Sequence, residues 1–199
     1  MTRPTDRGPA SRRVARIGIA VVLIVGVGLQ VSALVAHQQA DRANQQARAD
    51  EQQGSVVDAA TARTWFDALA THCRAIDYEG ARPIFADDLI AFGTFTDFMH
   101  GRALTEQKQW RNVWGTIRNF RVNLDTVEAI VSADRLTAIG MGVWMSHGFH
   151  PNGDRFDRGG RATVGLGRRQ VGDPFVATHT HLSLNRGTPD RSFGRFSAP

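Results

Sequence analysis

Two histidines and a serine near the C-terminal end of the chain have a spacing that could bring their side chains together. They belong to the stretch VATHTHLSL at 176–184, whose β-branched and apolar residues are typical of a strand. Side chains two positions apart on a strand share a face, so we expect His179, His181 and Ser183 to line one side of it. Such a group could hold a metal ion, provide a general base, or form the polar wall of a pocket.

A metal site needs more ligands than this strand supplies. A zinc ion is held by at least three protein side chains, and the candidates for the third are His100, His147 and His150. No glutamate follows residue 128, so the histidine and glutamate pattern of cupin-like metal sites is absent. We therefore expect no metal and no other cofactor.

Two interpretations of the histidines remain. In the catalytic one, His179 or His181 is a general base with Asp97 or His147 as its partner, because imidazole titrates near neutral pH. In the other, the histidines form a polar patch inside a cavity or at a sheet-to-sheet dimer contact, where neighbouring groups satisfy the ring nitrogens. We favour the second interpretation.

The N-terminal segment has the pattern of a membrane anchor. Residues 17–36 carry no charge, and a helix of that length reaches about 30 Å, the thickness of the hydrocarbon core of a bilayer. Five arginines lie in residues 1–16, which favours a cytoplasmic basic tail and a periplasmic body. We thus expect a single pass through the bacterial cytoplasmic (inner) membrane. A cleaved signal peptide is the alternative, since VSA at 31–33 could be a cleavage site.

The positive charge of the chain does not indicate nucleic-acid binding. The net charge is +5, but from Ser55 onward 17 Lys and Arg face 15 Asp and Glu, so the excess is concentrated near the N-terminus. The single cysteine, Cys73, excludes an intramolecular disulfide and falls in an apolar helical pattern, where a buried thiol is expected.

The remaining segments predict one folded domain. Residues 37–54 are polar and rich in Ala and Gln, which favours a helical stalk, and residues 187–199 resemble a disordered tail. Between them, at 55–186, helical periodicity comes first and alternating strands follow. The expected helices lie at 56–76, 78–85 and 105–115, and the expected strands at 89–95, 118–131, 136–147, 161–169 and 176–184.

This order predicts an α+β fold, in which a cone-shaped, curved antiparallel sheet packs on three helices behind a single transmembrane helix. The mouth of such a cone is a natural apolar pocket. On the strand at 136–147, Gly140 and Gly142 share one face, which predicts a bend or a close contact there.

Two stretches resemble a known superfamily. AIDYEGARPIFADDLIAFG at 75–93 and THTHLS at 178–183 are similar to nuclear transport factor 2-like proteins, which include ketosteroid isomerases and SnoaL-like polyketide cyclases. The resemblance covers about residues 56–186. It implies a cone pocket, which we expect to be lined by Trp65, Phe92, Trp110, Trp144, His147, His179 and His181.

The resemblance does not extend to ketosteroid isomerase chemistry. Those enzymes have a general-base aspartate eight residues after the position of Phe85, and Gly93 stands there in this chain. They have a tyrosine acid sixteen residues before it, where this chain has Leu69. Proton abstraction needs a positioned base, so this mechanism is not expected.

Two functions follow as hypotheses. The first is a membrane-anchored, non-catalytic module that binds a small apolar ligand or acts as an accessory subunit in a membrane complex or homodimer. The second is a SnoaL-like isomerase, cyclase or hydrolase that acts on a small apolar substrate in the cone, with His179, His181 or Asp97 as catalytic candidates.

Overall fold

The computed structural model describes the backbone of residues 11–198 and the side chains of residues 35–198. Helix α1 (Ser11–Ala75) is the first element, and the chain divides into two compact units after residue 52. The predicted span at 17–36 lies almost entirely outside the residues whose side chains are described. No helix in the described part is long and apolar enough to cross a membrane. The predicted stalk at 37–54 is helical, as part of α1.

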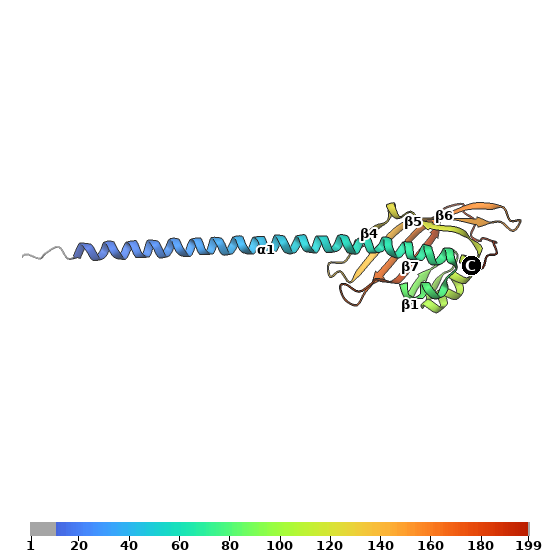
Figure 1. Ribbon diagram of the computed structural model, residues 1–199, viewed down its shortest axis with the longest axis horizontal. Helices are drawn as coiled ribbons and strands as arrows, with labels where there is room; N and C mark the ends of the chain where they lie inside the picture. Colours follow the sequence, from blue (N-terminus) through green and yellow to red (C-terminus); the bar gives the residue numbers. More distant parts are fainter. Residues whose placement is uncertain (1–10, 199) are drawn as a thin grey trace, which may run out of the picture. The chain divides into compact units, whose positions relative to one another are not determined.

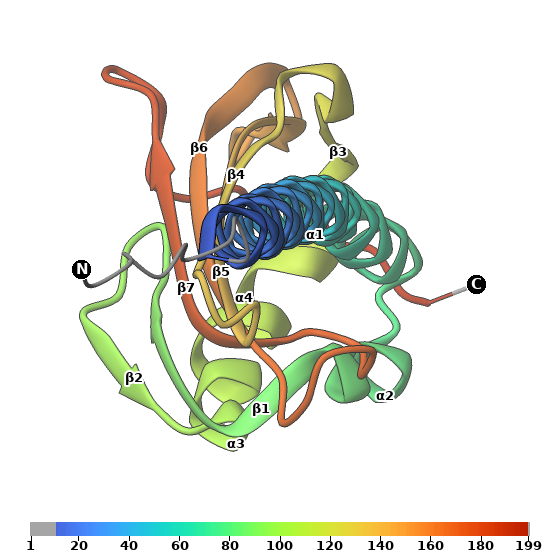
Figure 2. The same cartoon turned by 90° about the vertical axis from the view of Figure 1, so that its left-hand side faces the viewer.

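The second unit, residues 53–199, is built around one sheet (Figures 1 and 2). Its strand order is β2-β1-β7-β6-β5-β3, and β4 also pairs with β5. All pairs are antiparallel except β1 with β7, which run parallel. The fully antiparallel sheet expected from the sequence is therefore interrupted at that pair. The strands are β1 (Phe85–Phe92), β2 (Phe98–His100), β3 (Arg118–Val122), β4 (Glu128–Val131), β5 (Thr137–Phe149), β6 (Arg155–Gly167) and β7 (Val176–Leu184).

Short helical segments lie between α1 and β1, between β2 and β3, and between β3 and β4. The predicted second helix divides into one α-helical and one 3-10 turn, and the predicted third helix begins earlier, at Arg102. The predicted strand at 118–131 is split by a 3-10 turn into β3 and β4. These segments are α2 (Tyr78–Ala81), η1 (Arg82–Ile84), α3 (Arg102–Thr105), the π-helical η2 (Glu106–Trp110), α4 (Arg111–Val113), η3 (Trp114–Thr116) and η4 (Leu124–Thr126).

The C-terminal part of α1 lies directly against β5, at the two glycines that the sequence analysis singled out. A Cβ built on Gly140 would lie 3.1 Å from Ala62 Cβ and 3.3 Å from Phe66 Cε2. A Cβ on Gly142 would lie 3.2 Å from Val122 Cγ1. The predicted close contact is therefore confirmed, and the missing side chains let the helix approach the sheet.

A buried ion cluster ties α1 to the loops at one end of the sheet. The Asp58 carboxylate accepts hydrogen bonds from Arg135 Nε at 2.7 Å and Arg168 Nη2 at 2.8 Å. Arg135 reaches it across Gly54, where a Cβ would lie 2.5 Å from its Nη1. Burial raises the pKa of Asp58, but its bonds to the two arginines outweigh this and hold the pKa below its usual value.

The alternation of β5 gives the sheet two different faces. Trp144 and Ser146 are buried on the face that α1 covers, whereas Ile139, Val143 and Met145 are 45–47% exposed on the other. We call these the inner face and the outer face. Because successive side chains point to opposite sides of a strand, each position on β5, β6 and β7 belongs to one of them.

The C-terminal segment contains no helix or strand in the described residues 187–198, but it is held against the domain. Phe196 packs on Phe149, with ring centroids 5.3 Å apart, and the Arg118 guanidinium lies 3.7 Å from the Phe196 centroid. Ser192 Oγ donates to the carbonyl of Thr116 and accepts a hydrogen bond from the amide of Phe149 at 2.9 Å. The expectation of a disordered tail does not account for these contacts.

Candidate functional site

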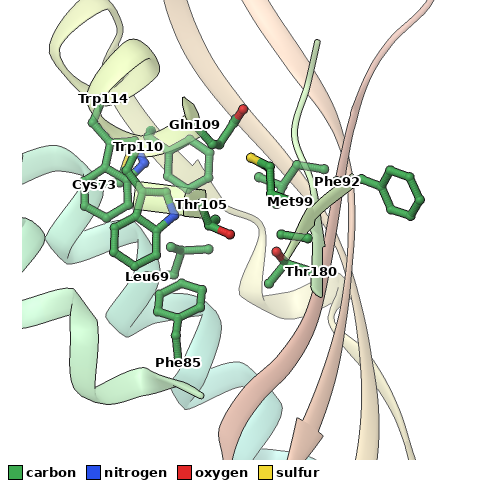
Figure 3. Close-up of a pocket in the computed structure, with 13 residues that line it drawn as sticks. Leu69, Cys73, Phe85, Phe92, Met99, Thr105, Gln109, Trp110, Trp114 and Thr180 are labelled. Atoms are coloured by element: carbon green, nitrogen blue, oxygen red, sulfur yellow. The ribbon is translucent and has the colours of Figure 1, made fainter. Parts of the chain in front are cut away.

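An apolar cavity lies between α1, the inner face and the helical segment from α3 to η3. Its volume is about 40 Å³. Figure 3 shows the rings of Phe85, Trp110 and Trp114 gathered with Leu69 on one side and Met99 and Thr180 on the other. The lining residues are Leu69, Cys73, Phe85, Ala91, Phe92, Met99, Thr105, Gln109, Trp110, Trp114, Phe120, Thr180 and Leu182.

The cavity contains few polar groups, and none of them is a base at neutral pH. Thr105 Oγ1 already donates to the carbonyl of Gly101 at 3.0 Å. Burial raises the pKa of Cys73, so its thiol is neutral. Gln109 Oε1 is buried and has no hydrogen-bond donor among the described residues. The described lining residues include neither a carboxylate nor an imidazole, so they offer no general base for proton abstraction.

The two positions that matter in ketosteroid isomerases are filled differently here. Leu69 lies in the cavity wall and contributes only apolar surface. Gly93 lies against Gln109, since a Cβ built on Gly93 would be 2.0 Å from Gln109 Oε1. An uncharged amide therefore takes the space in which a side chain at position 93 would have to fit.

The aromatic residues predicted for the pocket are divided between the cavity and the core. Trp110 lines the cavity. Phe92 belongs to the lining as well, but its ring points away from the cavity (Figure 3). Trp65 and Trp144 are core residues, and their Nε1 atoms donate to the carbonyls of Ile84 at 2.9 Å and Arg161 at 3.1 Å.

The histidines of β7 lie on the outer face, away from the cavity. His179 pairs with Gly165 and His181 with Thr163 across to β6, and the residue between them, Thr180, is the buried one. His179 Nδ1 lies 3.0 Å from the carbonyl oxygen of Ile90. The expectation that these histidines line the cone is therefore corrected. The residue alternation of β7 places Thr180 and Leu182 there instead.

The other polar candidates do not gather around these histidines. His147 is also on the outer face, where its Nδ1 lies 3.2 Å from Asn119 Nδ2 and its Nε2 3.9 Å from an Asp157 carboxylate oxygen. This placement removes His147 from the predicted pocket. Asp97 is exposed in the turn between β1 and β2. Within the described residues, no three His, Cys, Asp or Glu side chains are grouped closely enough to hold a metal ion.

Sequence reasoning missed most of the apolar residues that line the cavity. Thr180 and Leu182 could have been found, because alternation places them opposite His179 and His181. Gln109 and Met99 carry no such signal, since their meeting in space depends on how β2 and the π-helical turn fold against the sheet.

Comparison with known proteins gives information on the fold. No protein-family model and no curated protein matches the chain. A ketosteroid isomerase-like protein from Erwinia carotovora atroseptica SCRI1043 has a TM-score of 0.55 at 13% identity, covering 66% of this chain and 98% of that one. The CaMKII hub of S. rosetta has a TM-score of 0.53 at 13% identity, covering 64% and 96%.

A third solved structure has a similar fold. A protein of the NTF2-like family from Streptomyces avermitilis has a TM-score of 0.50 at 15% identity, covering 62% of this chain and 93% of that one. At these identities the likeness concerns the fold and not the activity. The chain therefore has the α+β fold of nuclear transport factor 2-like proteins, a curved open sheet packed against helices.

Proposed function

We propose that the domain is a non-catalytic association module whose outer face packs against a second copy of the chain. The observation that carries this proposal is a row of apolar side chains on uncovered strands. Ile130 on β4 is 63% exposed, and Ile139, Val143 and Met145 on β5 are 47%, 46% and 45% exposed. Contiguous apolar surface of this kind is typical of protein interfaces.

The small volume of the apolar cavity also supports a role in association and not in ligand binding. Pockets that bind small molecules usually measure about 300–1,000 Å³, whereas this one measures about 40 Å³. The tryptophans and phenylalanines that line it fill the cone with the protein's own side chains. An apolar ligand of ordinary size would need the core to open, so we assign the domain a role in association and not in binding at this cavity.

A second copy suits the outer face because the face carries both signs of charge around its apolar row. Arg121 and Arg161 are exposed on β3 and β6, and Glu128 and Asp157 on β4 and β6. A two-fold axis brings the same surface of two copies together, so arginines of one copy can meet carboxylates of the other. The S. rosetta protein with the same fold is itself described as a hub.

Membrane attachment is a further part of the proposal. The uncharged stretch at 17–36 and the arginines before it would anchor the chain in the bacterial inner membrane, with the domain in the periplasm. Extraction of membranes with alkaline carbonate tests this directly. The anchored chain stays in the membrane pellet, and recovery of the full-length chain in the supernatant would refute the anchor.

The association proposal is tested by measuring the mass of the full-length chain in detergent by light scattering. The wild type should be a dimer, and Val143→Arg should shift it to the monomer, because a charge enters the apolar centre of the contact. Val171→Arg is the matched control, since Val171 is 49% exposed in the loop before β7 and outside the row. A monomeric wild type, or a Val143→Arg dimer as stable as the control, would overturn the proposal.

The alternative function is a SnoaL-like isomerase, cyclase or hydrolase. One observation favours it, namely the buried Gln109 Oε1, which is free to accept a hydrogen bond from a substrate. Turnover of a small apolar substrate that is lost in Gln109→Leu and kept in His181→Ala would support this alternative. Turnover that depends on His181 would contradict the placement of the reaction in the cavity.

A further inference from the structure

Arg158 is a buried cation with an incomplete set of partners. Arg158 lies on β6, is 2% exposed, and points to the inner face. Its Nη2 donates to Thr94 Oγ1 at 3.0 Å, which is the one hydrogen bond of the guanidinium within the described residues. Its Nε is buried without an acceptor there. A guanidinium offers five N–H donors, so most of the hydrogen-bonding capacity of Arg158 is unused.

No carboxylate of the described residues forms an ion pair with Arg158. Three other arginines do have carboxylate partners, since Arg168 and Arg135 bind Asp58, and Arg82 binds Glu106. Burial of an unpaired charge is costly, because the ion loses its hydration without gaining a counter-charge. The charge of Asp190 offsets part of the effect of burial on the pKa of Arg158, but Asp190 is not among the ion-pair partners. No described side chain therefore gives Arg158 a carboxylate in direct contact.

The Arg158 side chain forms part of a cleft of about 310 Å³ that is distinct from the cone cavity and shares no lining residue with it. The walls come from the β1–β2 loop, the α4–η3 segment, β6 and the C-terminal segment. Ser192 fixes the last wall through its bonds to Thr116 and Phe149. The residues around this cleft are Phe95, Asn112, Val113, Thr116, Arg158, Asp190, Arg191 and Ser192.

The charged and apolar groups of the cleft indicate which kind of anion it can bind. Arg158 and Arg191 contribute two positive charges and Asp190 one negative charge, which leaves a balance of one positive charge. A singly charged ligand matches this balance better than a doubly charged phosphate. Phe95 and Val113 offer apolar surface beside the charged groups. A carboxylate with a small apolar body satisfies both features.

We propose that this cleft binds a small organic monocarboxylate, with Arg158 as the residue that receives its carboxylate group. A planar guanidinium pairs with a carboxylate through parallel hydrogen bonds, which a lysine cannot reproduce. Trp144 supports the cation from within the core, since the Arg158 Cζ lies 5.3 Å from its ring centroid. Thr94 and Trp144 thus act as positioning residues for the guanidinium.

The protonation of Arg158 is compatible with this role. Burial lowers the pKa of its guanidinium to about 10, and the group is still charged at neutral pH. The charge is kept although the site is desolvated, so each hydrogen bond to an incoming carboxylate is made in an environment of low dielectric constant, where it is strong.

Titration of the full-length protein in detergent with benzoate, followed by calorimetry, tests the proposal. Benzoate should bind, and the neutral isostere benzamide should bind about tenfold to 100-fold more weakly, because a hydrogen bond to a charged group is lost. Inorganic phosphate should bind more weakly than benzoate. Equal binding of benzamide, tighter binding of phosphate, or no binding of benzoate would overturn the proposal.

Variants locate the ligand within the cleft. Arg158→Met should weaken benzoate binding about tenfold or more relative to the wild type. Arg158→Lys should weaken it as well, because an ammonium group cannot form the two parallel hydrogen bonds. Asp190→Asn removes the negative charge from the cleft and should strengthen binding about two- to fivefold. Val171→Arg, in the exposed loop before β7 and outside the cleft, is the control that should leave the affinity unchanged. If Arg158→Met fails to fold, Arg158→Lys and Asp190→Asn still test the proposal. Unchanged affinity for benzoate in both variants would refute the role of Arg158.

Discussion

The backbone of Gly93 lies so close to the side chain of Gln109 that a Cβ atom on Gly93 would be 2.0 Å from Gln109 Oε1. Thr96 Oγ1 would be the next neighbour, at 2.4 Å. A larger residue at position 93 would therefore have to push the ends of the Gln109 and Thr96 side chains aside.

Gly93→Ala should destabilise the domain by about 1–3 kcal/mol, the usual cost of overpacking a buried site. Denaturant unfolding of the wild type and the variant measures the difference. Gln109→Ala should remove the obstruction, so that Gly93→Ala costs less in that background than alone. Additive effects of the two substitutions would show that the predicted clash does not exist.

Asp58→Asn should remove the charge that pairs with the buried side chain of Arg168 and the half-buried side chain of Arg135. The side chains of Asp58 and Arg168 are 4% and 5% exposed, and loss of one partner of a buried ion pair costs about 3–5 kcal/mol. Asp67 is exposed on the same helix, so Asp67→Asn is the matched control and should change stability by less than about 0.5 kcal/mol. Equal unfolding midpoints for the two variants would contradict the role of the cluster.

The same carboxylate should make stability depend on pH. The pKa of Asp58 is lower in the folded protein than in the unfolded chain. Its contribution is therefore fully present above the unfolded value of about 3.9 and is lost as the pH falls through the folded pKa. Unfolding free energies measured between neutral and acidic pH should fall less steeply in Asp58→Asn than in the wild type. Parallel curves would mean that other carboxylates account for the acid sensitivity.

The same substitution at two neighbouring residues of β7 should change the stability of the domain by very different amounts. Thr180→Arg places a charge on the inner face and should destabilise the domain by more than about 3 kcal/mol. His181→Arg places the same side chain on the outer face and should change stability by less than about 0.5 kcal/mol. Urea unfolding of both variants gives the comparison. A large loss in His181→Arg would mean that the histidine faces the core after all.

Cys73 should resist thiol reagents in the folded protein. It is 3% exposed, and burial raises the pKa of its thiol, so that the reactive thiolate is scarce and inaccessible. Iodoacetamide at pH 8 should label the chain slowly in buffer and rapidly in urea, as read by mass spectrometry. Rapid labelling without urea would show that the cavity around Cys73 opens readily.

The sequence by itself determined the strand at 176–184, because a run of β-branched and apolar residues with turn residues on both sides has few other conformations. It also determined that helices lie mainly in the first half of the domain and long strands in the second half, and hence the α+β class. The close contact at Gly140 was foreseen for a similar local reason, since a glycine among larger residues marks an approach of another segment.

Which face of that strand looks inward was decided only by tertiary structure. Alternation shows that His179 and His181 share one side and Thr180 and Leu182 the other, but it does not say which side a helix covers. The answer depends on where α1 packs, and α1 packs where Gly140 and Gly142 leave room. The lack of a direct ion pair at Arg158, although Asp190 lines the same cleft, is likewise a result of distances between segments far apart in the chain, and no local pattern encodes such distances.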